Sequence, residues 1–253
     1  MTKSFPIVLM YHGVVAESSD IPPDREEGAG LYDLLAQRFS EQMEFLNQQN
    51  VEPGKILITF DDGERNNIKR AFPILRQFGF SAYFFVTVNR IGKKGYMNWE
   101  ELKELRDANM VIGSHGVNHV IMTGLKDKDI ERELFQSKEV LERNLKVNVE
   151  DFSVSRGFYN EKILNTAQEV GYKQVFVSER NDQLSQQNVI GRVAVKAEWS
   201  LKRFEQAIRG EVPLEEAGVN VVNSLVKKSL GNTGYDKFRK IFLGQRSKNS
   251  KVS

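Results

Sequence analysis

The stretch Ile56-Leu57-Ile58-Thr59-Phe60-Asp61-Asp62-Gly63 is a short apolar run that ends in two adjacent carboxylates and a glycine. An apolar, β-branched run of this length is typical of a buried parallel strand, and in α/β folds function collects at the carboxyl ends of such strands. Because neighbouring side chains on a strand point in different directions, Asp61 and Asp62 need not share one role, and one can hold a metal ion while the other handles protons. Asp and Gly are also favoured turn residues, so the stretch alone leaves a simple turn open.

A second polar block follows another short apolar run, Val111-Ile112. It reads Gly113-Ser114-His115-Gly116-Val117-Asn118-His119 and holds two of the three histidines of the chain. The i, i+4 spacing predicts that both imidazoles lie on one face of a helical turn, where both reach one cation. Two histidines and one carboxylate leave positions open for water and substrate, which is typical of a catalytic metal site. Together with the strand-end aspartates, the block favours a metal site over a chance spacing.

The two blocks together resemble the first two motifs of the polysaccharide deacetylases, the NodB-homology domain of carbohydrate esterase family 4. The similarity extends from about Ile7 to about Phe204 and includes Leu9-Met10-Tyr11-His12-Gly13-Val14, Trp99-Glu100-Glu101-Leu102, the helix around Glu133-Leu134 and Ser137-Lys138, and Gly171-Tyr172. These segments suggest the branch typified by poly-N-acetylglucosamine deacetylases. The resemblance implies removal of N-acetyl groups from amino sugars.

The resemblance also implies a role for each residue of the two blocks. In the family the second Asp of the first motif is a metal ligand and the first is the general base. Asp62, His115 and His119 would then hold a divalent metal, and Asp61 would take the proton from water. Such a metal lowers the pKa of water and polarises the carbonyl under attack, which makes an amide or ester hydrolase. The ligand types admit zinc, cobalt, iron or nickel, and we predict Zn²⁺.

The departing amine needs a proton, which many family members supply from a late Leu-x-His motif. No histidine follows His119 in this chain. The remaining histidine, His12, ends the first predicted strand, and Met10-Tyr11-His12 resembles the late motif with Met in place of Leu, as if the order were circularly permuted. We therefore predict His12 as the general acid. The alternative is that His12 only caps the strand by hydrogen bonding.

The third family motif, Arg-x-Pro-Tyr-Gly or Tyr-Pro-Tyr-Gly, is where the chain departs from the pattern. The chain reads Phe152-Ser153-Val154-Ser155-Arg156-Gly157-Phe158-Tyr159-Asn160. We predict that Arg156, Gly157 and Tyr159 bind substrate. A backbone N–H near Arg156 would bind the oxyanion, since that role needs no particular side chain. The guanidinium of Arg156 would bind an anionic group.

Arg192, in the last predicted strand region, resembles a recurring position of this branch. There its charge would steady Asp61, and we group Arg192 with the predicted substrate-binding residues. A surface arginine is the equally weighted alternative.

Strands and helices alternate along the chain outside these motifs. Alternation predicts parallel pairing with right-handed crossovers. An open doubly wound sheet would show the same alternation, and the family resemblance decides for a distorted, incomplete (β/α)7 barrel. A loop from Glu17 to Gly30 follows the first strand and is predicted to form a wall of the substrate groove. The predicted strands are 7–11, 56–60, 82–86, 111–112, 151–154, 174–177 and 189–195.

With 253 residues the chain is long enough for one large α/β domain. We predict a catalytic domain over residues 1–210 and a basic segment over 211–253. Within that segment, residues 221–253 hold eight Lys or Arg against one acid, Asp236, with aromatic residues interleaved. It is predicted to be a solvated tail or a short basic amphipathic helix on anionic lipid or a partner.

Composition limits the partners and the compartment. Because 36 basic and 34 acidic residues leave a formal charge of +2, we predict no nucleic-acid partner. The absence of cysteine excludes disulfides and thiolate metal sites. The N-terminus shows neither the apolar region nor the cleavage site of a signal peptide, so we expect a cytoplasmic protein, membrane-associated through the basic segment. Nothing in the sequence indicates an oligomeric state.

The sequence thus favours a metal-dependent hydrolase that removes N-acetyl groups from the amino sugars of a polysaccharide, an oligosaccharide or a glycan precursor. Two alternatives stay open. One is a metal amidohydrolase that acts on a small non-sugar amide with the same residues. The other is a non-catalytic glycan-binding protein of the same fold, against which the intact set of acids and histidines argues, since a binder needs no base beside a metal.

Overall fold

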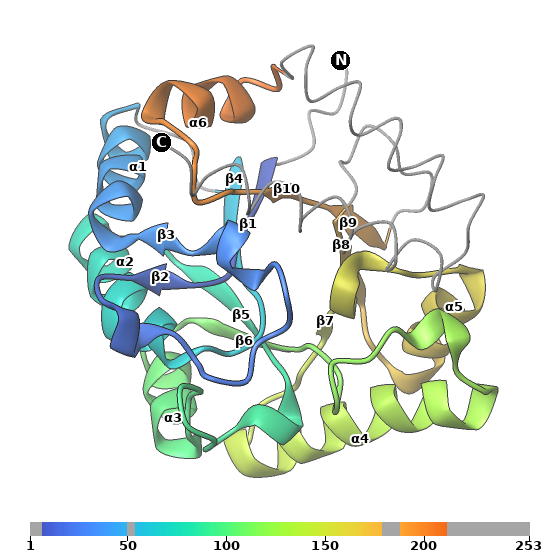
Figure 1. The fold of residues 1–253 in the computed structure, drawn as a ribbon. Coiled ribbons are helices and arrows are strands. Elements are labelled where there is room, and N and C mark those ends of the chain that lie inside the picture. The colour runs from blue at the N-terminus through green and yellow to red at the C-terminus, as the bar shows by residue number, and fades with distance from the viewer. Residues whose placement is uncertain (1–6, 50–53, 179–187, 212–253) are drawn as a thin grey trace.

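The structure is a computed structural model that describes residues 7–49, 54–178 and 188–211. An eight-stranded parallel sheet with the order β10-β1-β4-β5-β6-β7-β8-β9 forms its centre, and helices pack around the outside (Figure 1). The strands are β1 (Ile7–Tyr11), β4 (Ile56–Phe60), β5 (Ala82–Val86), β6 (Val111–Ser114), β7 (Asp151–Ser153), β8 (Gln174–Val177), β9 (Val189–Gly191) and β10 (Val193–Ala194). A separate two-stranded sheet, which the sequence did not indicate, pairs β2 (Val14–Val15) with β3 (Leu34–Leu35).

The last strand segment joins the two ends of the large sheet. β9 pairs with β8, whereas β10 pairs with β1 through Leu9 and Val193. Only Arg192 separates β9 from β10, so one extended segment bridges the sheet ends and leaves a single break. The seven predicted strands are therefore present, with the seventh interrupted at Arg192. The predicted distorted (β/α)7 barrel is confirmed.

Helices cover the outside of the barrel, and local capping sets several of their ends. Asn98 starts α3 by accepting a hydrogen bond from the Glu101 N–H, and the Glu101 side chain accepts one from the Asn98 N–H. Gly79 and Gly171 end α2 and α5 in the left-handed conformation, which glycine adopts without steric cost. The helices are α1 (Ala36–Gln48), α2 (Phe72–Phe78), α3 (Trp99–Asp107), α4 (Asp127–Leu145), α5 (Glu161–Val170) and α6 (Leu201–Ile208). Among these described helices, none has the length and apolar character needed to span a bilayer.

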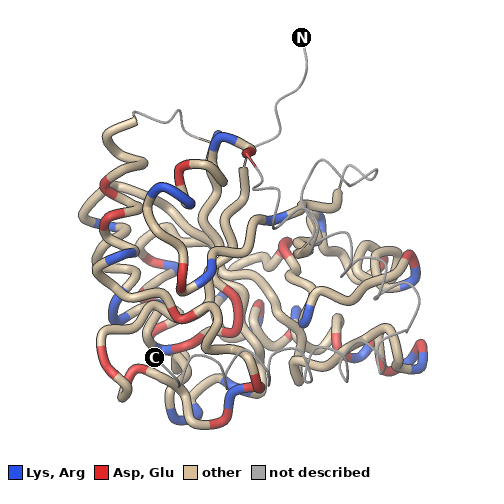
Figure 2. Tube along the Cα trace, turned by 45° about the horizontal axis from the view of Figure 1, so that its top comes forward, with Lys and Arg blue, Asp and Glu red and all other residues tan. Residues whose placement is uncertain are grey.

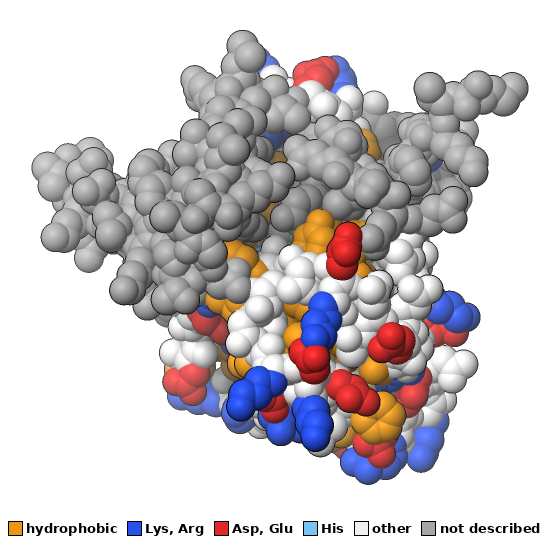
Figure 3. All heavy atoms as spheres, turned by 90° about the vertical axis from the view of Figure 1, so that its right-hand side faces the viewer, with side chains coloured by type: hydrophobic (Ala, Val, Ile, Leu, Met, Phe, Trp, Pro, Cys, Tyr) orange, Lys and Arg blue, Asp and Glu red, His pale blue; other side chains and the backbone are white. Residues whose placement is uncertain are grey.

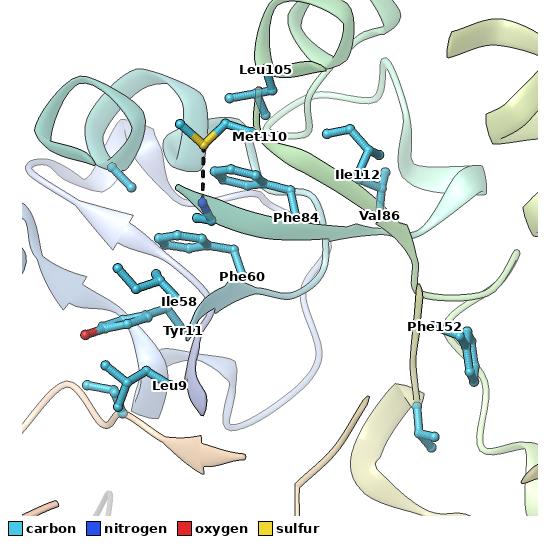
Figure 4. Close-up of a cluster of buried hydrophobic side chains, with 14 of the residues drawn as sticks. Leu9, Tyr11, Ile58, Phe60, Phe84, Val86, Leu105, Met110, Ile112 and Phe152 are labelled. Carbon is cyan, nitrogen blue, oxygen red and sulfur yellow. Dashed lines mark hydrogen bonds between the residues drawn. The ribbon is translucent and has the colours of Figure 1, made fainter. Parts of the chain in front are cut away.

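The main core lies between the sheet and the helices. Figure 4 shows Tyr11, Phe60 and Phe84 side by side on three neighbouring strands. Phe60 stacks on Phe84 with ring centroids 5.0 Å apart and on Tyr11 at 5.5 Å. Because side chains alternate along a strand, the next residue, Phe85, belongs to a second cluster with Val8 and Phe176 inside the barrel.

The loop predicted at 17–30 is more ordered than a simple connection. It contains two short 3₁₀ turns, η1 (Ser18–Asp20) and η2 (Ala29–Tyr32). Arg70 pairs with Asp20 at 3.0 Å, which ties the first turn to the region before α2. The loop is therefore anchored to the barrel next to the carboxyl end of β1.

Charged residues of both signs are interspersed along the described chain (Figure 2) and over the described part of the face in Figure 3. From residue 212 onward, the basic segment lies outside the described residues. Its boundary and its roles as a tail or a lipid-binding helix stay predictions.

Candidate functional site

Asp61 and Asp62 directly follow β4, and their side chains meet different partners. The Asp61 N–H donates to the Tyr11 carbonyl at 3.0 Å and so continues the strand pairing by one residue. Asp62 and Gly63 then both adopt positive φ angles of 76°. A left-handed conformation is uncommon outside glycine, although Asp tolerates it better than most residues. The sharp turn directs the Asp61 carboxylate to Arg192 and the Asp62 carboxylate to the histidines.

His115 and His119 lie in the loop after β6, and the predicted helical turn is wrong. No helix is present over residues 115–121. Instead Gly116 has φ +79° and His119 has φ +57°, so the loop folds back on itself and brings the two rings to a centroid distance of 5.0 Å. The two imidazoles meet as predicted, but through a loop and not through helical spacing.

Glu133 of α4 explains why this loop does not continue as a helix. Its carboxylate accepts hydrogen bonds from the N–H groups of Val117 and Asn118 at 2.9 and 3.0 Å, and also from the Asn118 side chain. Glu133 is buried. A charged acceptor thus captures the backbone donors that a helical turn would have used, and fixes the loop between the two histidines.

Asp62, His115 and His119 offer ligand atoms that all lie within 4.8 Å of one another. The Asp62 Oδ1 atom is 3.1 Å from Nε2 of His119 and 3.6 Å from Nε2 of His115. This is the set that the sequence predicted as metal ligands. These residues fit a metal ion, because their three donor atoms lie close enough together to bind one cation.

The tautomer of His115 supports that fit. Its Nδ1 lies 2.8 Å from the Ser153 carbonyl oxygen, which only accepts, so Nδ1 carries the hydrogen. Burial lowers the pKa of His115 to about 4, so the ring is neutral and Nε2 holds a lone pair. That lone pair faces the Asp62 carboxylate at 3.6 Å. Two acceptors that face each other in a buried site are stabilised by a shared cation.

His119 is held by a residue that none of the sequence motifs contains. Its Nδ1 lies 2.6 Å from Oε1 of Glu26, in the loop after β2. Although burial disfavours the charged ring, Asp62 and Glu26 raise the pKa of His119 to about 9. Arg90, after β5, also reaches Asp62 Oδ1 at 3.1 Å and donates to Glu26. In the sequence, only their positions after the ends of predicted strands could have indicated that Glu26 and Arg90 lie at the site.

Asp61 forms a buried ion pair with Arg192. The two guanidinium nitrogens lie 2.7 and 2.8 Å from the two carboxylate oxygens, and the Ser153 hydroxyl donates to Oδ2 at 3.1 Å. Burial tends to raise the pKa of Asp61, but Arg192 outweighs it and lowers that pKa below its usual value. Arg192 is 1% exposed, which excludes a surface position. The charge contact with Asp61 that the family resemblance implied is therefore present, whereas Arg192, which we grouped with the substrate-binding residues, does not line the cavity beside Asp61.

A cavity of about 100 Å³ opens over this cluster. His12 lies in its wall and stacks on Tyr32 with ring centroids 4.8 Å apart. Burial lowers the pKa of His12. Tyr159, by contrast, packs against the hydrophobic core and is not part of this wall. The predicted site residues that do line the cavity are His12, Asp61, Asp62, His115, His119, Arg156 and Gly157.

A parallel α/β barrel whose strand ends gather two aspartates and three histidines around one cavity is typical of a hydrolase. Comparison with known proteins gives the family. The polysaccharide deacetylase family matches residues 48–175, and the chain belongs to this family.

Two curated relatives are each 30% identical to the chain. YxkH of Bacillus subtilis (strain 168), named as a polysaccharide deacetylase, aligns over 172 residues, which are 66% of this chain and 62% of YxkH. The peptidoglycan-N-acetylglucosamine deacetylase of Bacillus cereus aligns over 128 residues, 50% of this chain and 58% of that protein. The chain therefore spans about three fifths of the length of these relatives.

Solved structures share the fold. The deacetylase PplD of Streptococcus pyogenes, in complex with acetate, superposes with a TM-score of 0.69 at 21% identity and covers 80% of this chain and 97% of its own. IcaB of Ammonifex degensii gives a TM-score of 0.69 at 22% identity over 81% of this chain and 97% of its own. These similarities agree with the barrel described above.

Proposed function

We propose that the protein is a metal-dependent de-N-acetylase, which hydrolyses the acetamido group of an N-acetylated amino sugar in a polysaccharide, an oligosaccharide or a glycan precursor. The observation that carries the proposal is the convergence of Asp62, His115 and His119 beside the buried acid Asp61 in one cavity. Family membership and the name of the Bacillus cereus relative support an amino sugar as the substrate.

Asp62, His115 and His119 would hold the metal, for which we propose Zn²⁺, with Co²⁺, Fe²⁺ and Ni²⁺ as alternatives. Two imidazoles and one carboxylate suit these ions better than Ca²⁺ or Mg²⁺, which prefer oxygen ligands throughout. When bound, the metal supplies a Lewis acid and lowers the pKa of water.

Asp61 is proposed as the general base that takes the proton from water. A base must be ionised before it acts, and Arg192 keeps this buried carboxylate ionised by charge. Arg192 and the Ser153 hydroxyl also fix the orientation of the carboxylate. Oδ2 accepts from both Arg192 and Ser153, whereas Oδ1 accepts from Arg192 alone, so a second lone pair of Oδ1 is left for the proton.

His12 is proposed as the general acid that protonates the departing amine. Its ring lies in the wall of the same cavity, and stacking on Tyr32 sets the plane of the ring. Among the described residues, its buried Nδ1 atom has no hydrogen-bond partner. This ring nitrogen is therefore a candidate to meet a polar group of the substrate.

Arg156 and Gly157, which line the same cavity, are proposed to contact the substrate. Both have positive φ angles, 63° and 70°, so the chain makes a tight turn at the cavity. The Ser155 hydroxyl fixes this turn by donating to the His115 carbonyl at 2.9 Å. A turn tied to a metal-site residue is suited to holding the acetamido group in place.

Acetate release tests this proposal. Zinc-loaded protein should release acetate and expose equal amounts of free amine from chitooligosaccharides or poly-N-acetylglucosamine fragments, and should leave a panel of small non-sugar amides intact. Turnover of the small amides alone would instead identify a small-amide hydrolase. Binding of the oligosaccharides by metal-loaded protein without any acetate release would identify a glycan-binding protein.

A further inference from the structure

We propose that Glu26 is a positioning residue that completes the metal centre by holding His119, with Arg90 as its partner. The inference rests on the proposed metal site. It concerns a side chain from a distant part of the sequence that none of the motifs contains.

The hydrogen bond to Glu26 determines which atom His119 offers to a metal. Oε1 of Glu26 lies 2.6 Å from Nδ1 of the ring, and the opposite nitrogen, Nε2, lies 3.1 Å from Asp62 Oδ1. A carboxylate only accepts, so it keeps a hydrogen on Nδ1, and Nε2, on the side of Asp62, is the nitrogen that offers its lone pair to a metal when the ring gives up its other proton. Partners of this kind fix the orientation of a metal-binding histidine and make the ring more basic.

The two histidines differ in how they are held. Nδ1 of His115 donates to the backbone carbonyl of Ser153, which is part of β7 and keeps its place whatever side chain is present. Nδ1 of His119 depends on the side chain of Glu26. A single substitution outside the ligand set, at Glu26, should therefore change the orientation of His119 but not that of His115.

Arg90 links Glu26 to the ligand set from the other side. Its guanidinium donates to Glu26 and lies 3.1 Å from Asp62 Oδ1, with its face 5.2 Å from the ring centroid of Tyr96. A fixed positive charge this close to Asp62 opposes the binding of a cation. Glu26 offsets that charge, because its carboxylate lies against the same guanidinium. Asp62, Arg90, Glu26 and His119 therefore form a closed ring of contacts.

The loop that carries Glu26 is anchored by its neighbour in the sequence. Arg25 points the other way and pairs with Asp33 at 2.5 Å and with the buried Glu64 at 2.9 Å. Pro22 packs against Gly95 so closely that a Cβ atom at position 95 would lie 2.6 Å from the Pro22 Cα. Because these contacts dock the loop, Glu26 is presented to His119 by a fixed backbone.

Metal affinity provides the test. In a competition titration with a chromophoric chelator, Glu26→Ala should bind Zn²⁺ and Co²⁺ about 10 to 100-fold more weakly than wild type. Glu26→Gln keeps an acceptor oxygen but not the charge, and its metal affinity should lie between those of wild type and Glu26→Ala. The matched control is Asp24→Ala, which removes an exposed carboxylate from the same loop and should leave the affinity unchanged.

Imidazole NMR adds a readout that a general loss of stability would not change. The chain has three histidines, so selective ¹⁵N labelling gives three ring systems to assign. In zinc-loaded Glu26→Ala, the Nδ1–H signal of His119 should be lost or exchange-broadened while that of His115 persists. If Glu26→Ala fails to fold, Glu26→Gln carries the same comparison.

Wild-type affinity together with an intact His119 Nδ1–H signal in Glu26→Ala would overturn the inference. That result differs from a failure of the proposed metal site. If the metal site itself is wrong, wild-type protein binds no metal. If only the role of Glu26 is wrong, wild type binds metal and His115→Ala loses it.

Discussion

Replacement of Asp61 by Asn is expected to lower kcat for acetate release by about 10²–10⁴-fold, the usual contribution of a general base. The amide has nearly the shape of the carboxylate but does not take up a proton. Because Asp61 points to Arg192 and not to the ligand cluster, the zinc content should stay at the wild-type level. Steady-state kinetics and elemental analysis of the same samples measure both quantities.

The control for this prediction concerns Arg192, which loses its counter-charge in Asp61→Asn. Thermal unfolding of the zinc-loaded variant shows whether the protein is still folded at the assay temperature. A folded, zinc-containing Asp61→Asn with wild-type kcat would remove Asp61 from the chemistry. Loss of zinc in this variant would instead place Asp61 among the ligands.

Replacement of Arg192 by Met is expected to destabilise the protein by about 3–5 kcal/mol, because it leaves the Asp61 carboxylate buried without its partner. Arg192 also donates to the Val177 carbonyl at 3.3 Å and to the Ser153 hydroxyl at 2.8 Å, so it connects three strands at the barrel break. Urea unfolding at pH 7, with equal slopes for both proteins, measures the difference.

Two further variants test the cause of that loss. Arg132→Met removes an exposed arginine from α4, whose pair with Asp129 contributes little, and should change stability by at most about 0.5 kcal/mol. The double variant Asp61→Asn with Arg192→Met removes both charges and should be more stable than Arg192→Met alone. If Arg192→Met is as stable as Arg132→Met, the buried pair contributes nothing to the barrel.

Local sequence patterns predict the barrel strands because each is a short apolar run with a polar end. β5 (Ala82–Val86) and β8 (Gln174–Val177) have the predicted bounds, because polar residues or glycine flank these apolar runs. The gathering of Asp61, Asp62, His115 and His119 follows from the same pattern, because parallel strands bring their carboxyl ends to one edge.

The remainder of the site depends on contacts between distant parts of the chain. Glu26 and His119 are 93 residues apart, and no local period relates them. The helical turn expected at the histidines fails because Glu133, on a different helix, binds the loop N–H groups. The local pattern does not distinguish Arg192 from a surface arginine. The family resemblance predicted its contact with Asp61, and closure of the barrel brings the two together.

Elemental analysis of purified wild-type protein and of His115→Ala tests directly whether Asp62, His115 and His119 bind a metal ion. We expect a near-stoichiometric divalent metal in wild type and its loss in His115→Ala, whose remaining ligands are one carboxylate and one imidazole. Wild-type protein without bound metal, even after reconstitution with zinc, cobalt or iron, would show that these residues are not a metal site.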